Sequence, residues 1–226
     1  MPKIAFFLSL ALPLFAGFFP ETVHTSITSA TAKTLQLKNP FAYNGMSGIV
    51  THQYGSKLQA ITSRIVQVSK SKMQLLKGDM VNHDNLPTIN TSVQAGDKVI
   101  GGYLYDNVLL LAPDAQTYKQ LTSTYTKNWI HPDLFAMYLS NIGDKKPTKE
   151  NLASFAKTYQ VGLICIVSQN SLKLLDPISG KVIRQKSMSG LPNKGKSPFF
   201  MRLDKIDSGM FSSSTTQSYY DIMKSL

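Results

Sequence analysis

The spacing of hydrophobic positions changes near residue 112. Before that point, apolar and β-branched residues alternate with polar ones in short runs between turn residues, a pattern that predicts β-strands. The runs cover residues 22–29, 34–38, 49–54, 58–69, 73–77 and 99–105, followed by a wholly apolar run over 108–111. The mixed faces of 58–69 indicate a bend or bulge, and 78–95 lacks any period and is expected to be a loop. Residues 18–112 are therefore predicted to form a β-rich subdomain, a small antiparallel β-barrel or sandwich.

After residue 112 the apolar positions recur every three or four residues, the spacing of amphipathic helices. Asp114 is a predicted cap for a helix over 115–125, and Thr148 is a predicted cap for a helix over 149–160. Between them, Pro132 is predicted at the first position of a helix that continues through 133–142. Three further strands are expected at 161–167, 172–175 and 181–186. Residues 113–190 therefore read as an α/β subdomain, a three-helix plus β-meander layer, and the whole chain as α+β.

The two ends of the chain differ from the rest. Lys3 followed by the apolar run over 4–16 predicts a signal peptide at residues 1–17. Leu14 is large for a position before a cleavage site, so an uncleaved anchor stays open as an alternative. Residues 191–226 are rich in Gly, Pro, Lys and Ser, and they are expected to form a flexible basic tail with one short helix over 219–223.

Export follows from the predicted signal peptide. No other stretch is long and apolar enough to cross a bilayer as a helix, so no transmembrane span is expected once the signal is removed. The expected location is the periplasm, the outer membrane or the cell surface. The single cysteine, Cys165, lies in an apolar run and is expected in the core, without an internal disulfide.

Composition and charge narrow the class of partner. Hydrophobic residues make up 42% of the chain, which predicts a folded protein. The formal net charge of +11 comes from scattered lysines, which fit either a solvated face or association with an acidic surface. The basic residues do not interleave with aromatic ones as in RNA-binding modules, so nucleic acid is not an expected partner.

The most conspicuous polar constellation is Trp129-Ile130-His131-Pro132-Asp133. His131 and Asp133 could in principle transfer protons as a pair. We expect these residues to have structural roles instead: Trp129 packs in the core, His131 supports the turn, and Asp133 stabilises the start of the helix that begins at Pro132. Together these residues are predicted to fix the joint between the two halves.

No other pattern predicts catalysis or metal binding. The remaining histidines lack the spacing of metal ligands, and no serine lies in a Gly-x-Ser-x-Gly elbow. Gly101-Gly102 indicates a bulge or a close backbone approach rather than a phosphate-binding loop. The sequence therefore predicts a non-enzymatic protein without catalytic residues, metal ligands or a cofactor.

Several segments resemble a known family. They are Gly45-Met-Ser-Gly-Ile-Val50, Gly96-Asp-Lys-Val99, Tyr103-Leu-Tyr-Asp106, Leu111-Ala-Pro113 and Trp129-Ile-His-Pro-Asp-Leu-Phe-Ala136. Over residues 20–190 the chain resembles the N-terminal domain of bacterial plasminogen-binding surface proteins of the PgbA type. The resemblance implies an exported cell-envelope module that captures plasminogen, a host protein.

The resemblance also implies lysine-type contacts to the partner. The kringle domains of plasminogen bind an ammonium group together with a carboxylate, best supplied by a C-terminal lysine. Here Lys224 precedes the last two residues, and Lys145, Lys146 and Lys149 have acidic neighbours in sequence, so these four are the candidate contacts. A second possibility stays open, because a small barrel followed by an α/β layer is similar in outline to periplasmic accessory proteins that assemble around the flagellar motor.

Overall fold

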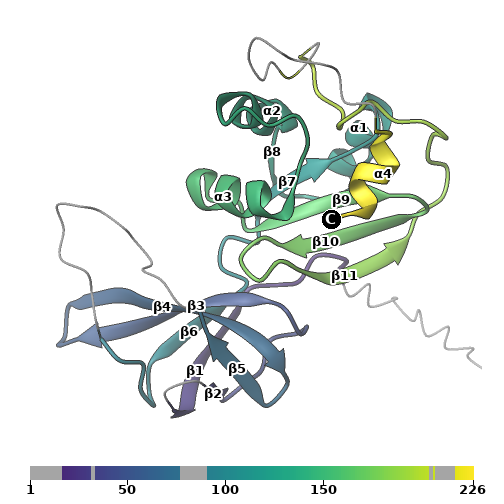
Figure 1. Ribbon diagram of the computed structural model, residues 1–226. Helices are drawn as coiled ribbons and strands as arrows, with labels where there is room; N and C mark the ends of the chain where they lie inside the picture. The colour runs from purple at the N-terminus through teal and green to yellow at the C-terminus, as the bar shows by residue number, and fades with distance from the viewer. Residues whose placement is uncertain (1–16, 32–33, 77–90, 204–205, 207–216) are drawn as a thin grey trace, which may run out of the picture.

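The computed structural model describes residues 17–31, 34–76, 91–203, 206 and 217–226. These residues form two units, a closed β-barrel from the first half of the chain and a five-stranded sheet with helices from the second (Figure 1). The α+β class predicted from the sequence is confirmed. Residues 1–16, which make up nearly all of the predicted signal peptide, lie outside the described residues.

Six antiparallel strands close the barrel in the order β1-β2-β5-β4-β3-β6. They are β1 (Val23–Ala30), β2 (Thr34–Leu37), β3 (Ser47–Tyr54), β4 (Leu58–Ser69), β5 (Lys72–Leu75) and β6 (Lys98–Gly101). The alternating apolar positions are buried and pack into one cluster, with Ile27, Leu35, Val50, Ile65, Met73 and Val99 among its members. The register of the long strand β4 shifts against both β3 and β5, as its mixed faces predicted.

Two glycines allow Phe41 to pack closely against the barrel wall. Gly48 of β3 lies opposite Gly101 of β6. A Cβ atom added to Gly101 would lie 2.2 Å from the Phe41 ring, and one added to Gly48 would lie 2.9 Å from it. The close approach expected at Gly101-Gly102 therefore has a cause, since the buried ring occupies the space of a side chain at Gly101.

The chain leaves the barrel earlier than the apolar run over 99–105 indicated. Gly102 has φ +68° and Leu104 has φ +64°, so residues 102–106 form a turn instead of continuing the strand. The Tyr105 N–H donates to the Gly102 carbonyl at 3.1 Å. The prediction of a strand at 103–105 was wrong because the turn directs the Tyr105 side chain into the core, where an aromatic residue is as favourable as in a strand.

The second sheet has the strand order β11-β10-β9-β7-β8. Its strands are β7 (Asn107–Leu111), β8 (Asn128–Ile130), β9 (Leu163–Ser168), β10 (Ser171–Asp176) and β11 (Lys181–Ser187). The central strand β7 runs parallel to β8 and β9, while β9, β10 and β11 form the predicted antiparallel meander. Strand β7 therefore belongs to the second unit and not to the β-rich half in which the sequence pattern placed it. The short strand β8 lies between the first two predicted helices, where no strand was expected.

Among the described residues, four helices cover the two faces of this sheet, and the short helix expected over 219–223 is one of them. They are α1 (Ala115–Thr124), α2 (Pro132–Asn141), α3 (Lys149–Tyr159) and α4 (Tyr219–Lys224). Leu109 and Leu111 of β7 cluster with residues of α2, α3 and α4, whereas Val108 and Leu110 cluster with α1 and the N-terminal Phe18 and Phe19. The predicted starts are confirmed, because Asp114 and Thr148 accept hydrogen bonds from backbone N–H groups of α1 and α3 and Pro132 opens α2.

The C-terminal segment packs against the sheet where the sequence suggested a flexible tail. Phe199 and Tyr219 are wholly buried, and the Tyr219 hydroxyl lies 2.9 Å from the Leu111 carbonyl oxygen and 2.6 Å from that of Val167. The burial of its apolar residues was not predicted, because Gly, Pro and Lys residues separate them and leave no regular hydrophobic period. Residues 204–205 and the serine-rich stretch over 207–216 lie outside the described residues.

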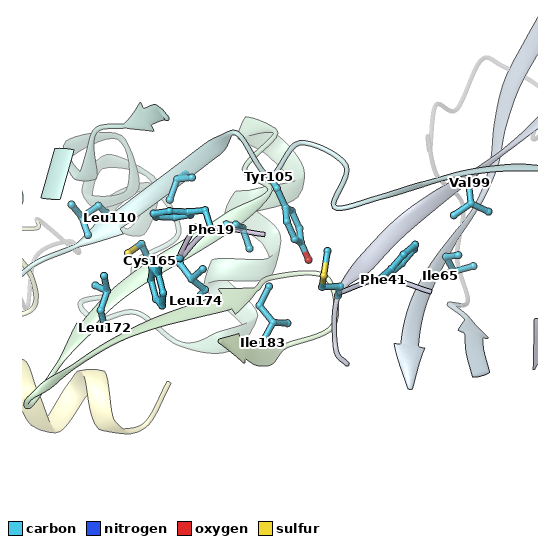
Figure 2. Packing of buried hydrophobic residues seen from close by; sticks show 14 of the residues in the cluster. Phe19, Phe41, Ile65, Val99, Tyr105, Leu110, Cys165, Leu172, Leu174 and Ile183 are labelled. Atoms are coloured by element: carbon cyan, nitrogen blue, oxygen red, sulfur yellow. The ribbon is translucent and has the colours of Figure 1, made fainter. Parts of the chain in front are cut away.

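One buried cluster runs from the barrel into the second unit. Figure 2 shows Tyr105 between the side chains around Cys165 and Leu110 of the sheet and those of Phe41 and Ile65 of the barrel. The Tyr105 hydroxyl donates to the Asp176 carboxylate at 2.5 Å, and the Ser47 N–H donates to the same carboxylate at 2.7 Å. The two units are therefore joined by a common core with a polar centre.

Candidate functional site

The loop between α2 and α3 carries three of the four lysines that the sequence singled out. Gly143, with φ +77°, ends α2, and Thr148 caps α3. Between them the Asp144 carboxylate accepts a hydrogen bond from the Asn151 side chain at 2.8 Å, which fixes the loop against the first turn of α3. The loop exposes Lys146, Lys149, Asp144 and Glu150, while Lys145 is half-buried. Ammonium and carboxylate groups thus lie side by side along one short surface segment.

The structure brings this loop next to the segment that leads into α4. The Lys146 ammonium donates to the Gln217 side chain at 2.7 Å, and Ser218 is the N-cap of α4. Lys224 is exposed in the last turn of that helix, whereas its neighbours Met223 and Leu226 are buried. Lys224 therefore lies at the opposite end of α4 from the contact with Lys146.

The residues predicted to form a structural joint lie at the entry to α2. Trp129 is in β8, its indole N–H donates to the Tyr125 carbonyl at 3.1 Å, and its ring contacts Phe19 edge-on. His131 is the N-cap of α2, where its Nδ1 accepts a hydrogen bond from the Asp133 N–H at 3.2 Å. Pro132 occupies the first helical position, where its missing N–H leaves no donor unpaired.

Asp133 is held by Arg202, which comes from the C-terminal segment. Its two carboxylate oxygens accept hydrogen bonds from the Arg202 backbone N–H at 2.8 Å and from its guanidinium Nε at 2.7 Å. Burial by itself would raise the pKa of Asp133, but these hydrogen bonds outweigh it and hold the pKa below its ordinary value. The pKa of His131 is lowered by its burial, against the influence of Asp133. A neutral His131 agrees with its role as a hydrogen-bond acceptor at the helix start.

Asp176 of β10 makes polar contacts between the two units. Asp176, wholly buried, accepts hydrogen bonds from the Ser47 N–H, the Tyr105 hydroxyl and the N–H groups of Ile178 and Ser179. The last two bonds form within the turn that follows β10. The first two bonds form only because the barrel packs against the second unit, and a pattern of neighbouring residues in the sequence cannot predict that contact.

The sequence also did not predict the contact between His52 and Asp97. The Nδ1 atom of His52 in β3 lies 2.6 Å from Oδ1 of Asp97, whose other oxygen accepts the Gln94 N–H at 3.0 Å. The spacing of the histidines in the sequence gave no sign of this pair. The pairing of β3 with β6 places Thr51 opposite Lys98 and so brings His52 to Asp97, which means that the strand register was the missing signal.

The described residues include no group of three or more His, Cys, Asp or Glu side chains arranged to hold a metal ion. Cys165 is wholly buried, and burial raises the pKa of its thiol far above the ordinary value. No described helix has the length and apolar character required to cross a membrane. The described part of the chain also has two hollows on the barrel, lined in part by Thr51 and Lys98.

These features define a class, a two-unit α+β protein that combines a six-stranded barrel with a mixed sheet and carries charged groups on its surface. The family model described as "Plasminogen-binding protein pgbA N-terminal" matches residues 22–226, and the chain belongs to that family. The resemblance noted from the sequence motifs is confirmed, and the match extends beyond residue 190 to the end of the packed C-terminal segment.

Two curated relatives agree with the family match. The chain is 30% identical over 149 residues to "Plasminogen-binding protein PgbA" of Helicobacter pylori strain J99, a match that covers 63% of this chain and 32% of the relative. It is 32% identical over 143 residues to the protein of the same name from strain 26695, covering 60% of this chain and 31% of the relative. The matched region therefore spans about a third of these relatives. No solved structure matches the chain.

Proposed function

We propose that this chain is an exported, non-enzymatic module of the cell envelope that binds plasminogen as its protein partner. The relatives carry plasminogen binding in their names, and the family match covers nearly the whole chain. The proposed contact surface is the loop between α2 and α3 with the start of α3. Lys145, Lys146 and Lys149 would supply ammonium groups there, beside the carboxylates of Asp144 and Glu150.

We choose this surface because ammonium and carboxylate groups lie together on one exposed segment. A site that recognises lysine together with a carboxylate needs the two groups a few ångströms apart, and neighbouring residues at the start of a helix supply that spacing. The loop is also fixed, because Asn151 donates to Asp144 and Lys146 donates to Gln217. Less conformational entropy is then lost when a partner binds.

Binding of plasminogen to the immobilised protein, competed by free lysine, tests the proposal. A variant with Lys145→Ala, Lys146→Ala and Lys149→Ala is expected to raise Kd by about tenfold, because the ammonium groups at the contact are lost. Lys224→Ala separately tests the remaining candidate at the end of α4.

The matched control removes three exposed lysines elsewhere, Lys70→Ala, Lys119→Ala and Lys157→Ala. It lowers the net charge by the same amount and is expected to leave Kd within about twofold, since screened long-range attraction is weak at physiological salt. An equal loss in both variants, or binding that free lysine leaves unchanged, would reject the proposed surface.

The location of the protein decides between this proposal and a structural role inside the periplasm. Protease added to intact cells is expected to degrade a surface-exposed module. Protection that persists until the outer membrane is permeabilised would favour an envelope-assembly component, such as an accessory protein of the flagellar motor, and would count against plasminogen capture.

A further inference from the structure

The outer surface of the barrel has a hollow that the proposed plasminogen contact does not use. It has a volume of about 510 Å³ and lies over β1, β6, β3 and β4. The strands β1, β6 and β3 are hydrogen-bonded neighbours, with His24 opposite Ile100 and Lys98 opposite Thr51 (Figure 1). The hollow is therefore built on paired strands, a rigid support for a binding site.

A smaller hollow of about 210 Å³ continues from the first. The two share Thr51, Gln59 and Lys98, and the smaller one extends to His52 and to the turn that contains Asp97. The shared residues place the two hollows next to each other, and we call the pair the barrel groove, with Lys38 and Asn39 at one end and the 94–97 turn at the other. A groove of this form suits an extended ligand more than a compact one.

The groove contains two lysine side chains, Lys38 and Lys98, that have no acidic partner among the described residues. Within the described part of the chain, the side chains of Lys38 and Lys98 take part in no hydrogen bond or ion pair, and both are exposed. Among the described lining residues the one carboxylate is that of Asp97, which is buried and already accepts hydrogen bonds from His52 and from the Gln94 N–H. An anionic ligand would therefore meet two lysines without facing an exposed carboxylate.

The other lining groups are hydroxyls and amides. Gln59 donates to the Thr51 hydroxyl at 2.6 Å, and the Thr25 hydroxyl accepts from the Asn39 N–H at 3.0 Å, so each hydroxyl keeps a donor or acceptor position for a ligand. No described Phe, Tyr or Trp side chain lines either hollow. Nucleic acid bases need such platforms for stacking, whereas sugar hydroxyls pair with hydroxyl and amide groups.

We infer that this groove binds an acidic glycan, a sugar chain with sulfate or carboxylate substituents that contact Lys38 and Lys98. The site would let the barrel hold an anionic polysaccharide while the second unit contacts a protein. It is independent of the lysines of the α2–α3 loop.

Calorimetric titration of the purified protein with a heparin-derived hexasaccharide tests the inference. The double variant Lys38→Gln and Lys98→Gln is expected to weaken binding by about tenfold, since two charge-assisted contacts are removed. Gln59→Ala, which changes no charge, is expected to weaken it about threefold. All three side chains are exposed, so the thermal unfolding midpoint is expected to stay the same.

The control is Lys119→Gln with Lys157→Gln, which lowers the net charge equally on α1 and α3 of the second unit. It is expected to leave the hexasaccharide affinity unchanged. Equal losses in the two double variants, no measurable binding, or equal competition by a single-stranded oligonucleotide of the same charge would each overturn the inference. Plasminogen binding is expected to be normal in the Lys38→Gln, Lys98→Gln variant. Glycan binding by the groove and plasminogen binding by the α2–α3 loop can therefore be rejected independently of each other.

Discussion

At the scale of single residues, Asp176 links the barrel to the second unit by polar contacts. Its carboxylate is fully buried and accepts four hydrogen bonds, two from its own turn and two from Ser47 and Tyr105. A buried carboxylate is stable only when its oxygens are paired in this way. Burial, and after it the negative charge of Asp176, raise the pKa of Tyr105, which therefore remains a donor.

Replacing Asp176 is expected to destabilise the whole protein. Asp176→Ala leaves the Tyr105 hydroxyl and three backbone N–H groups without their acceptor, at a cost of about 3–5 kcal/mol. The measurement is urea unfolding followed by circular dichroism. Asp106→Ala is the matched control, because its side chain is 72% exposed in an ion pair with Lys127, and it is expected to cost under about 1 kcal/mol. Similar losses in both variants would contradict the role assigned to Asp176.

At the scale of elements, the C-terminal segment completes the second unit. Helix α4 packs against β9, and Tyr219, Ile222 and Met223 fill the same cluster as Leu111 and Ile166 of the sheet. Phe199 stacks on Phe135 of α2, with ring centroids 5.6 Å apart. A six-residue helix is too short to be stable by itself, so its order depends on this packing.

Tyr219 provides the test of this packing. Tyr219→Ala is expected to lower the free energy of unfolding by about 3–5 kcal/mol, since it opens a cavity beside β7 and β9. Tyr219→Phe keeps the ring and is expected to cost about 1 kcal/mol for the lost hydroxyl contacts with Leu111 and Val167. Lys224→Ala, on the exposed side of α4, serves as the control in thermal unfolding. A Tyr219→Ala variant as stable as that control would show that the segment adds nothing to the fold.

At the scale of the whole molecule, the barrel and the second unit share one hydrophobic cluster. It includes Phe41, Ile65 and Val99 on the barrel side, Tyr105 between the units, and Leu110 of the sheet (Figure 2). Because buried residues of both units belong to this one cluster, separating the units would expose apolar surface to water. The two units are therefore expected to unfold together.

A barrel substitution read out by the tryptophan of the other unit tests this coupling. Ile65→Ala removes a wholly buried side chain of β4 and is expected to cost about 2–5 kcal/mol. The fluorescence of Trp129, in β8, is expected to report the same shifted urea midpoint as circular dichroism. As a control, Leu58→Ala changes an apolar side chain of the same strand that is 62% exposed, and it should move neither midpoint. A Trp129 midpoint that stays fixed while the circular dichroism midpoint falls would show that the units unfold independently.

The sequence could predict the elements whose signals are local. The alternation of β1, β3 and β4, the caps Asp114 and Thr148, and the proline that opens α2 each depend on residues a few positions apart. It also predicted the α+β class and, through short motifs, the family. For the candidate site, the lysines of the α2–α3 loop could be named from their acidic neighbours in sequence, whereas the groove on the barrel could not.

Only the tertiary structure decided which features meet. It assigned β7 to the second sheet, ordered the C-terminal segment on α2 and β9, joined the units through Asp176, and placed Lys38 and Lys98 in one groove. The physical reason is the same in each case: these contacts depend on strand register and on burial between residues far apart in the chain. The sequence by itself determined the local secondary structure, the net positive charge and the family membership, because each is a property of composition or of short segments.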